Sequence, residues 1–149
     1  MRSMVAAAFI AVGLALTGCG GSGTLTFPGE GSCLFSGVTQ LVYPIPNATS
    51  VPDALSQVVF ASSQLFPYSF EVLINNDPNP GHAKRGTAAF FQRIGAGQVP
   101  TPSAPPTLSN PYYESATLST TFPHGTYYVF LNDSQVSCTP TQAGSFTTQ

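Results

Sequence analysis

The amino-acid sequence predicts an all-β fold, a single antiparallel sandwich of two sheets with about seven strands. Gly and Pro contribute 14 residues each to a chain of 149, and both disfavour helices. Outside residues 5–16, no long segment repeats apolar residues at helical spacing. From Gln40 onward, short segments rich in β-branched and aromatic residues alternate with turn clusters, as in two-sheet antiparallel folds. A small barrel would show the same local pattern.

Each expected strand is bounded by residues that favour turns, such as the Asn- and Pro-rich run at 75–81 and the Pro-rich segment 99–111. The clearest strand places Tyr127, Val129 and Leu131 on one face by alternation. The expected strands cover residues 40–43, 57–61, 69–74, 87–94, 112–122, 126–131 and 145–148.

The N-terminus has the features of an export signal. Arg2 precedes an apolar run at residues 5–16, which as a helix of about 18 Å is too short to span a bilayer core of about 30 Å. The run ends in Leu16-Thr17-Gly18-Cys19, which resembles the lipobox of bacterial lipoproteins. The resemblance implies cleavage before Cys19 and a diacylglycerol and a fatty acyl group, such as palmitate, on that residue. The alternatives are an ordinary cleaved signal or an N-terminal anchor helix, with Cys19 a free thiol.

The lipobox resemblance implies three regions along the chain. Residues 1–18 would be the signal peptide, 19–32 the lipidated Cys and a flexible Gly/Ser-rich tether, and 33–149 the folded domain. Two or more acyl chains hold a protein stably on a membrane. We therefore expect an exported protein whose partner is the membrane, bound through Cys19. Gly20 follows that Cys, and the resemblance implies delivery to the outer membrane in a cell with two membranes.

The remaining cysteines form an even pair. With Cys19 lipidated, Cys33 and Cys138 are left, and an oxidising compartment outside the cytoplasm would join them. Closing a loop of about 100 residues lowers the conformational entropy of the unfolded chain, which would raise the free energy of unfolding by on the order of 4 to 5 kcal/mol. The alternative is a reactive or metal-binding pair, but neither a C-x-x-C spacing nor a third ligand accompanies them.

Three segments resemble bacterial Ig-like and fibronectin type III domains. Residues 43–52, Tyr-Pro-Ile-Pro-Asn-Ala-Thr-Ser-Val-Pro, are similar to the opening strand and turn. Residues 122–129, Phe-Pro-His-Gly-Thr-Tyr-Tyr-Val, resemble the turn before the sixth strand, with its tyrosine corner, and residues 144–148 the final strand. The resemblance covers residues 38–149 and implies an Ig-like sandwich. The chain has no Trp, so the core Trp common in the wider family is absent.

The charges argue against nucleic acid as a partner, since the formal net charge is −2 and only 7% of residues are charged. Apart from Arg2, the cations Lys84, Arg85 and Arg93 lie close together in the sequence. They would form a contact surface for an envelope partner, or else a solvated hairpin that protects a sheet edge. Tyr112 and Tyr113 are the candidate aromatic contacts, and the loops at 75–86 and 99–111 the candidate contact loops.

Catalysis and metal binding have little support. Glu71 and Glu114 would be the carboxylate pair of a small hydrolase, but no nucleophile motif or phosphate loop is present. His82, His124 and Asp77 lack metal-site spacing, and we expect no metal and no cofactor. The sequence thus favours a non-enzymatic binding or structural module of the cell envelope. The runner-up is a carbohydrate-binding module that contacts an envelope glycan.

Overall fold

The computed structural model describes residue 33, residues 38–82 and residues 89–149. These residues form eight strands and two short 3₁₀ helices. The expected signal peptide and lipobox, including Cys19, lie outside the described residues, as do Lys84 and Arg85. The strands are β1 (Thr39–Tyr43), β2 (Ala48–Val51), β3 (Gln57–Ser62), β4 (Phe70–Asn75), β5 (Ala89–Ile94), β6 (Tyr112–Thr117), β7 (Gly125–Asp133) and β8 (Thr141–Thr148), and the helices are η1 (Pro80–His82) and η2 (Ala96–Gln98).

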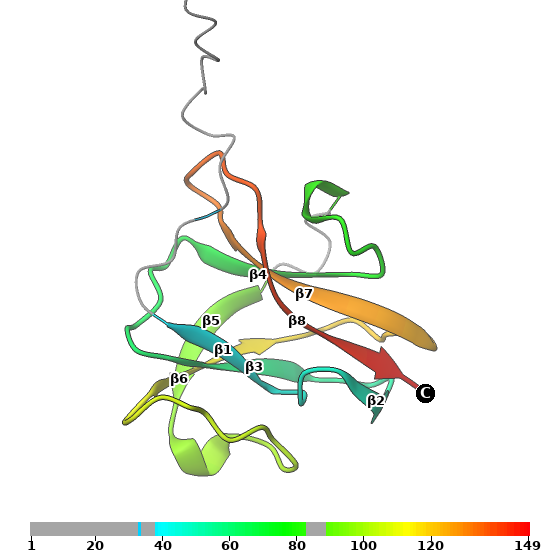
Figure 1. Ribbon diagram of the computed structural model, residues 1–149, viewed down its shortest axis with the longest axis horizontal. Coiled ribbons are helices and arrows are strands. Elements are labelled where there is room, and N and C mark those ends of the chain that lie inside the picture. Colours follow the sequence, from blue (N-terminus) through cyan, green and yellow to red (C-terminus); the bar gives the residue numbers. More distant parts are fainter. Residues whose placement is uncertain (1–32, 34–37, 83–88) are drawn as a thin grey trace, which may run out of the picture.

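The strands pair in the order β1-β3-β6-β5-β4-β7-β8-β2. Strand β5 divides this order into two sheets, because its residues 91–94 pair with β6 and its residues 89 and 90 pair with β4. Figure 1 shows the two layers, with β5 running from one to the other. Every pairing is antiparallel except that of β2 with β8. The all-β prediction is therefore confirmed.

One strand is additional to the expected ones, and two strand boundaries differ from the expected ones by four or more residues. The expected count of seven is wrong, because Ala48–Val51 forms an additional strand that pairs with β8. The strand expected to reach residue 122 ends at Thr117, since Leu118 and Phe122 donate backbone hydrogen bonds to the β2–β3 connection instead. Strand β8 begins at Thr141, four residues before its expected start, and pairs along β7.

The core lies between the two sheets and draws apolar side chains from both. Leu41, Phe60, Val72, Val129 and Phe146 are among its buried members. Within single strands the buried members are two residues apart, as expected of strands with one face toward a core: Val58 and Phe60, Val72 and Ile74, and Val129 and Leu131. Tyr127 packs against the same cluster, as its alternation with Val129 and Leu131 predicts.

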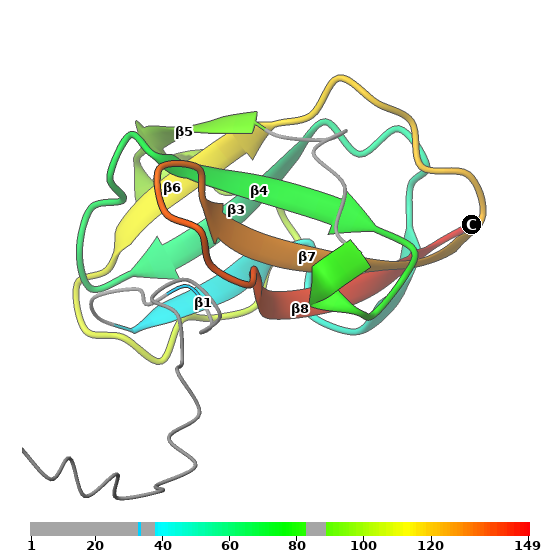
Figure 2. The same ribbon diagram turned by 90° about the horizontal axis from the view of Figure 1, so that it is seen from above.

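A second, smaller apolar cluster lies on the opposite face of strands β1 and β3. Val42, Val59 and Ala61 are buried there, and the partly buried Val99 and Tyr113 pack against them. Strand β3 therefore has buried residues on both faces, which explains why its burial does not alternate. Figure 2 shows the strands of the two sheets from above. Within the described residues, no helix has the length and apolar character needed to cross a membrane.

Candidate functional site

A pocket of about 370 Å³ opens at one end of the two sheets. We call this the Cys33 end, because Cys33, the β3–β4 loop (63–69) and the β7–β8 turn (134–140) meet there. The opposite end holds the C-terminal Gln149 and the β6–β7 connection. The pocket is lined by Leu65, Phe66, Pro67, Tyr68, Phe70, Phe91, Arg93 and Glu114. Its size lies within the range typical of small-molecule sites.

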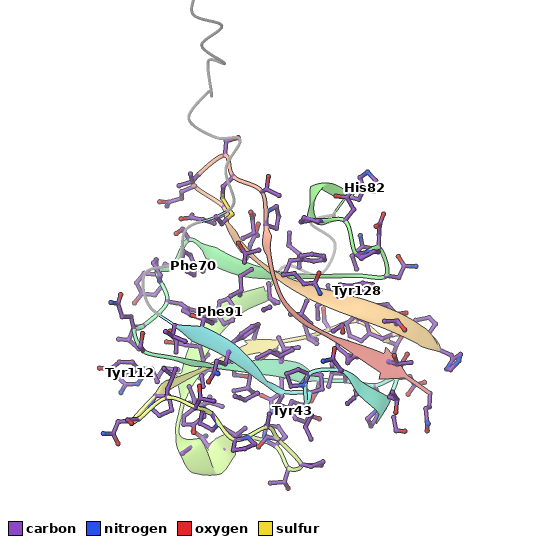
Figure 3. The ribbon with its side chains drawn as sticks, viewed as in Figure 1. Tyr43, Phe70, His82, Phe91, Tyr112 and Tyr128 are labelled. Carbon is purple, nitrogen blue, oxygen red and sulfur yellow. A yellow bond between two sulfur atoms is a disulfide. The ribbon has the colours of Figure 1, made fainter. Side chains whose placement is uncertain are left out.

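Three phenylalanine rings form the wall of the pocket. Phe66, from the β3–β4 loop, contacts the Phe91 ring edge-on, with 4.6 Å between ring centroids, and lies 5.5 Å from the Phe70 ring. Figure 3 labels Phe70 and Phe91 on this side of the molecule, with Tyr112 nearby. Edge-to-face contacts of this kind hold aromatic rings in a defined orientation. The loop is thus fixed to strands of both sheets, and the pocket wall is preformed.

Tyr68 stands at the rim of this pocket and is 99% exposed. Leu65 beside it is also exposed. A tyrosine that extends fully into water gains almost nothing for the fold, whereas its flat ring provides a contact surface for a partner. Neither residue was among the candidates from the sequence, because a single Tyr in a Pro-containing loop gives no periodic signal.

Two charged side chains complete the lining. Glu114 of β6 is 4% exposed, and its Oε1 accepts a hydrogen bond from the Phe66 backbone N–H at 3.4 Å. Desolvation raises the pKa of Glu114, against the lowering effects of that hydrogen bond and of the Arg93 charge. Arg93 is directly opposite Glu114 in the β5–β6 ladder, and its guanidinium lies 4.9 Å from the centroid of the Tyr112 ring. The pocket therefore combines an acceptor, a donor and aromatic walls.

The two candidate contact tyrosines lie on opposite faces of β6. Tyr112 shares the face of Glu114 and contacts Arg93, next to the pocket. Tyr113 instead packs into the smaller apolar cluster with Val59. Of the expected contact residues, the structure brings Arg93 and Tyr112 together and assigns Tyr113 a packing role.

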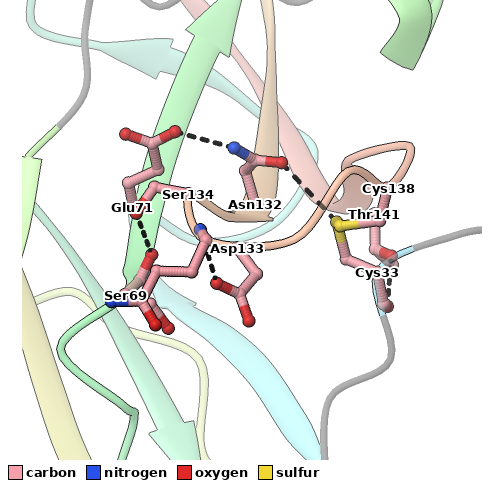
Figure 4. Close-up of a disulfide and its surroundings, with 9 residues drawn as sticks. Cys33, Ser69, Glu71, Asn132, Asp133, Ser134, Cys138 and Thr141 are labelled. Atoms are coloured by element: carbon pink, nitrogen blue, oxygen red, sulfur yellow. Dashed lines mark hydrogen bonds between the residues drawn. A yellow bond between two sulfur atoms is a disulfide. The ribbon is translucent and has the colours of Figure 1, made fainter. Parts of the chain in front are cut away.

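The two glutamates do not share a site. Glu71 lies on β4, is buried, and accepts a hydrogen bond from Asn132 Nδ2 at 2.7 Å, while Glu114 lines the pocket. Asn132 Oδ1 also lies 3.5 Å from the Cys33 sulfur, so Glu71 belongs to the surroundings of the disulfide (Figure 4). Two carboxylates that cleave a glycosidic bond must flank one sugar. Glu71 and Glu114 do not meet that condition.

Cys33 and Cys138 form the expected disulfide, with their Cα atoms 5.0 Å apart. The Cys33 N–H donates to the Thr139 carbonyl at 2.8 Å, and the Thr141 hydroxyl donates to the Cys33 carbonyl at 3.1 Å. These bonds attach residue 33 to the end of the β7–β8 turn and the start of β8, just after Cys138. Residue 33 is therefore fixed at the Cys33 end.

The two histidines lie apart from the pocket. His82 Nδ1 contacts Asp77 Oδ2 at 2.7 Å on the exposed β4–β5 loop, where the Asn79 backbone hydrogen bond and His82 lower the pKa of Asp77. His124 is exposed at the opposite end. Among the described residues, no three His, Cys, Asp or Glu side chains gather into a metal-binding group.

The Pro-rich segment 99–111 covers the free edge of β1. The Ala104 N–H donates to the Val42 carbonyl at 2.9 Å, and Thr107 exchanges two hydrogen bonds with the Gln40 side chain, at 2.7 and 2.9 Å. This edge would otherwise expose unpaired backbone groups. The expectation that the segment contacts a partner stays a prediction, and the structure adds that its central residues bond to β1. A smaller pocket of about 190 Å³ beside Pro44 and Pro102 has no charged lining residue.

No protein-family model, curated protein or solved structure matches this chain. The candidate site therefore stands on its own geometry, that of the pocket at the Cys33 end.

Proposed function

We propose that this protein is a lipid-anchored envelope lipoprotein whose Ig-like domain is a non-catalytic binding module. The observation that carries the proposal is the preformed aromatic pocket with one carboxylate and one guanidinium. Preformed pockets with a few polar groups in an apolar wall are the usual form of a binding site. Among the described lining residues, no second carboxylate and no nucleophile stands beside Glu114, which favours binding over hydrolysis.

The strand arrangement supports an Ig-like sandwich. Consecutive strands β1 and β2 lie at the edges of different sheets, with β2 parallel to β8, as when the first strand of an Ig-like domain divides between its sheets. The Tyr127 hydroxyl donates to the Pro123 carbonyl at 2.8 Å, four residues upstream. A hydrogen bond of this kind is typical of the tyrosine corner at the start of the sixth strand of such domains, which supports the proposal.

The anchor and the pocket fit one mechanism. Lipid on Cys19 would set the location, and residues 20–32 would give the domain its reach from the membrane. Because Cys33 is bonded to the β7–β8 turn, a tether that precedes it would reach the domain at the Cys33 end, where the pocket opens. A ligand of this module would thus belong to the envelope close to the anchoring membrane.

Palmitate labelling, fractionation and intact mass of the wild type and Cys19→Ser test the anchor. The wild type should carry lipid and sediment with membranes, and Cys19→Ser should do neither. Binding is tested by cosedimentation of the detergent-solubilised chain with isolated envelope material. Tyr68→Ala should weaken cosedimentation, while His124→Ala, an exposed change at the opposite end, should leave it intact. An unlabelled wild type contradicts the anchor, and equal cosedimentation of all variants contradicts the pocket.

A further inference from the structure

Glu114 accepts one hydrogen bond from the described residues. A carboxylate offers about four acceptor positions, and buried polar groups in folded proteins are normally hydrogen-bonded. Glu114 is 4% exposed, and the one hydrogen bond that the described residues provide is the 3.4 Å contact from the Phe66 N–H. Its remaining acceptor positions border the pocket. A ligand in the pocket would therefore meet a carboxylate that can accept further hydrogen bonds.

Arg93 supplies the complementary group. Its guanidinium only donates hydrogen bonds, while an ionised carboxylate only accepts them. The contact with the Tyr112 ring at 4.9 Å holds the guanidinium near the pocket without using its N–H groups as an ion pair would. Donor and acceptor thus face one ligand from neighbouring strands, β5 and β6.

The charges of the lining restrict the ligand. An anion is attracted by Arg93 but repelled by Glu114, and the reverse holds for a cation. The two groups together therefore favour neither sign of charge. A purely apolar ligand would remove water from the Glu114 carboxylate without offering it a hydrogen bond in return, which is unfavourable. An uncharged ligand with hydroxyl groups meets both requirements, because each hydroxyl donates to the carboxylate and accepts from the guanidinium.

The aromatic side chains restrict it further. The Phe66, Phe70 and Phe91 rings form an apolar wall, and the exposed Tyr68 ring stands at the rim. A pyranose ring carries hydroxyls at its edge and C–H groups on its faces, so it presents both surfaces that this pocket complements. An extended chain of such rings would continue outward over Tyr68.

We propose that this pocket binds an uncharged glycan, with one sugar residue between Glu114 and Arg93 and the next over the Tyr68 ring. The inference rests on the proposed function and specifies its ligand. Tyr68 and Glu114 thereby take the place of Tyr113 in the expected contact set, and Arg93 and Tyr112 remain in it.

Calorimetric titration of the full chain with tetrasaccharides tests the inference. The chain is held in a detergent without a sugar headgroup, since a glucoside detergent would compete. The probes are maltotetraose, cellotetraose, mannotetraose and chitotetraose, with choline chloride titrated in parallel. We expect at least one tetrasaccharide to bind.

The variants separate the pocket from the rest of the domain. Glu114→Gln should weaken binding about tenfold or more, because a charge-assisted hydrogen bond is lost. Tyr68→Ala should weaken it about threefold to tenfold through the lost ring contact. Glu71→Gln is the matched control, a buried carboxylate outside the pocket, and should bind as the wild type does. Tyr68 is fully exposed, so its variant keeps the test informative even if Glu114→Gln does not fold.

Three outcomes would overturn the inference. The first is that none of the tetrasaccharides binds the folded wild type. The second is that one binds but Glu114→Gln and Tyr68→Ala retain wild-type affinity. The third is that choline binds in a Glu114-dependent way and the sugars do not, which would make the pocket a cation site. Palmitate labelling is scored separately, so a lipidated chain that ignores sugars refutes only this inference, and an unlipidated chain that binds them refutes only the anchor.

Discussion

Removal of the Cys33–Cys138 disulfide should cost several kcal/mol without abolishing the fold. The bond closes a sequence separation of 105 residues, which encloses every strand except β8. Closing a loop of about 100 residues restricts the unfolded chain, and the entropy that this chain loses raises the free energy of unfolding by about 4.7 kcal/mol. Domains of this size are typically stable by about 5–15 kcal/mol. The double variant Cys33→Ser/Cys138→Ser should therefore lose about 3–5 kcal/mol and still fold.

The contacts around residue 33 explain why the fold should survive. Its backbone hydrogen bonds to Thr139 and Thr141 do not depend on the sulfur atoms, and each such bond is worth about 1 kcal/mol. The apolar core between the sheets contains neither cysteine. The variant should accordingly show native circular dichroism at 25 °C and a lower urea midpoint.

The assay is urea unfolding of a chain beginning at residue 20, in which Cys33 and Cys138 are the only cysteines. Because the chain has no Trp, tyrosine circular dichroism is the signal. Reduced wild type should match the double variant, and intact mass should show two hydrogens fewer in the oxidised form. If the double variant unfolds within about 0.5 kcal/mol of the oxidised wild type, the loop-closure reasoning is refuted.

Three further predictions concern single side chains. Tyr127→Phe removes the hydroxyl bond to Pro123 but keeps the ring, so urea unfolding should show a loss of about 1 kcal/mol, and no loss would refute the corner. In Gly144→Ala the new Cβ would lie 2.8 Å from Leu41 Cδ2, so urea unfolding should show a free energy of unfolding lower by about 1–3 kcal/mol. Because the two side chains are in contact, the double variant with Leu41→Ala should lose less than the sum of the two single losses. Desolvation raises the pKa of Glu114 in the native state above its ordinary value of 4.5. The native state therefore binds this proton more tightly than the unfolded state does, which adds stability at pH values below 4.5. The added stability is lost as the pH rises through the higher native pKa. Glu114→Gln should lack that loss in urea unfolding series at several pH values, and identical pH profiles would contradict the raised pKa.

The sequence predicted those parts of the fold that depend on local alternation. Strand β7 shows this clearly, since the alternation of Tyr127, Val129 and Leu131 matches the face that enters the core. Strand β2 was not predicted, because its residues lie among prolines. Its pairing with β8 depends on residues about a hundred positions away, which no local pattern reports.

The candidate site was predicted in part. Arg93 and Tyr112 were identified as contacts from their residue types, and they meet beside the pocket. Glu114 was considered as a catalytic acid, but only the fold shows that the β3–β4 loop donates a hydrogen bond to it through the Phe66 N–H. The role of residues 99–111 was also hidden, because composition does not reveal that Ala104 bonds to the edge of β1.

Photo-cross-linking in living cells tests the central claim, that the pocket at the Cys33 end is the binding surface. A benzoylphenylalanine replaces Tyr68 at the pocket rim, and in a matched variant it replaces the exposed His124 at the opposite end. We predict that position 68 captures an envelope component in the membrane fraction and that position 124 does not. Capture from position 124 alone, or from neither position, would contradict the claim.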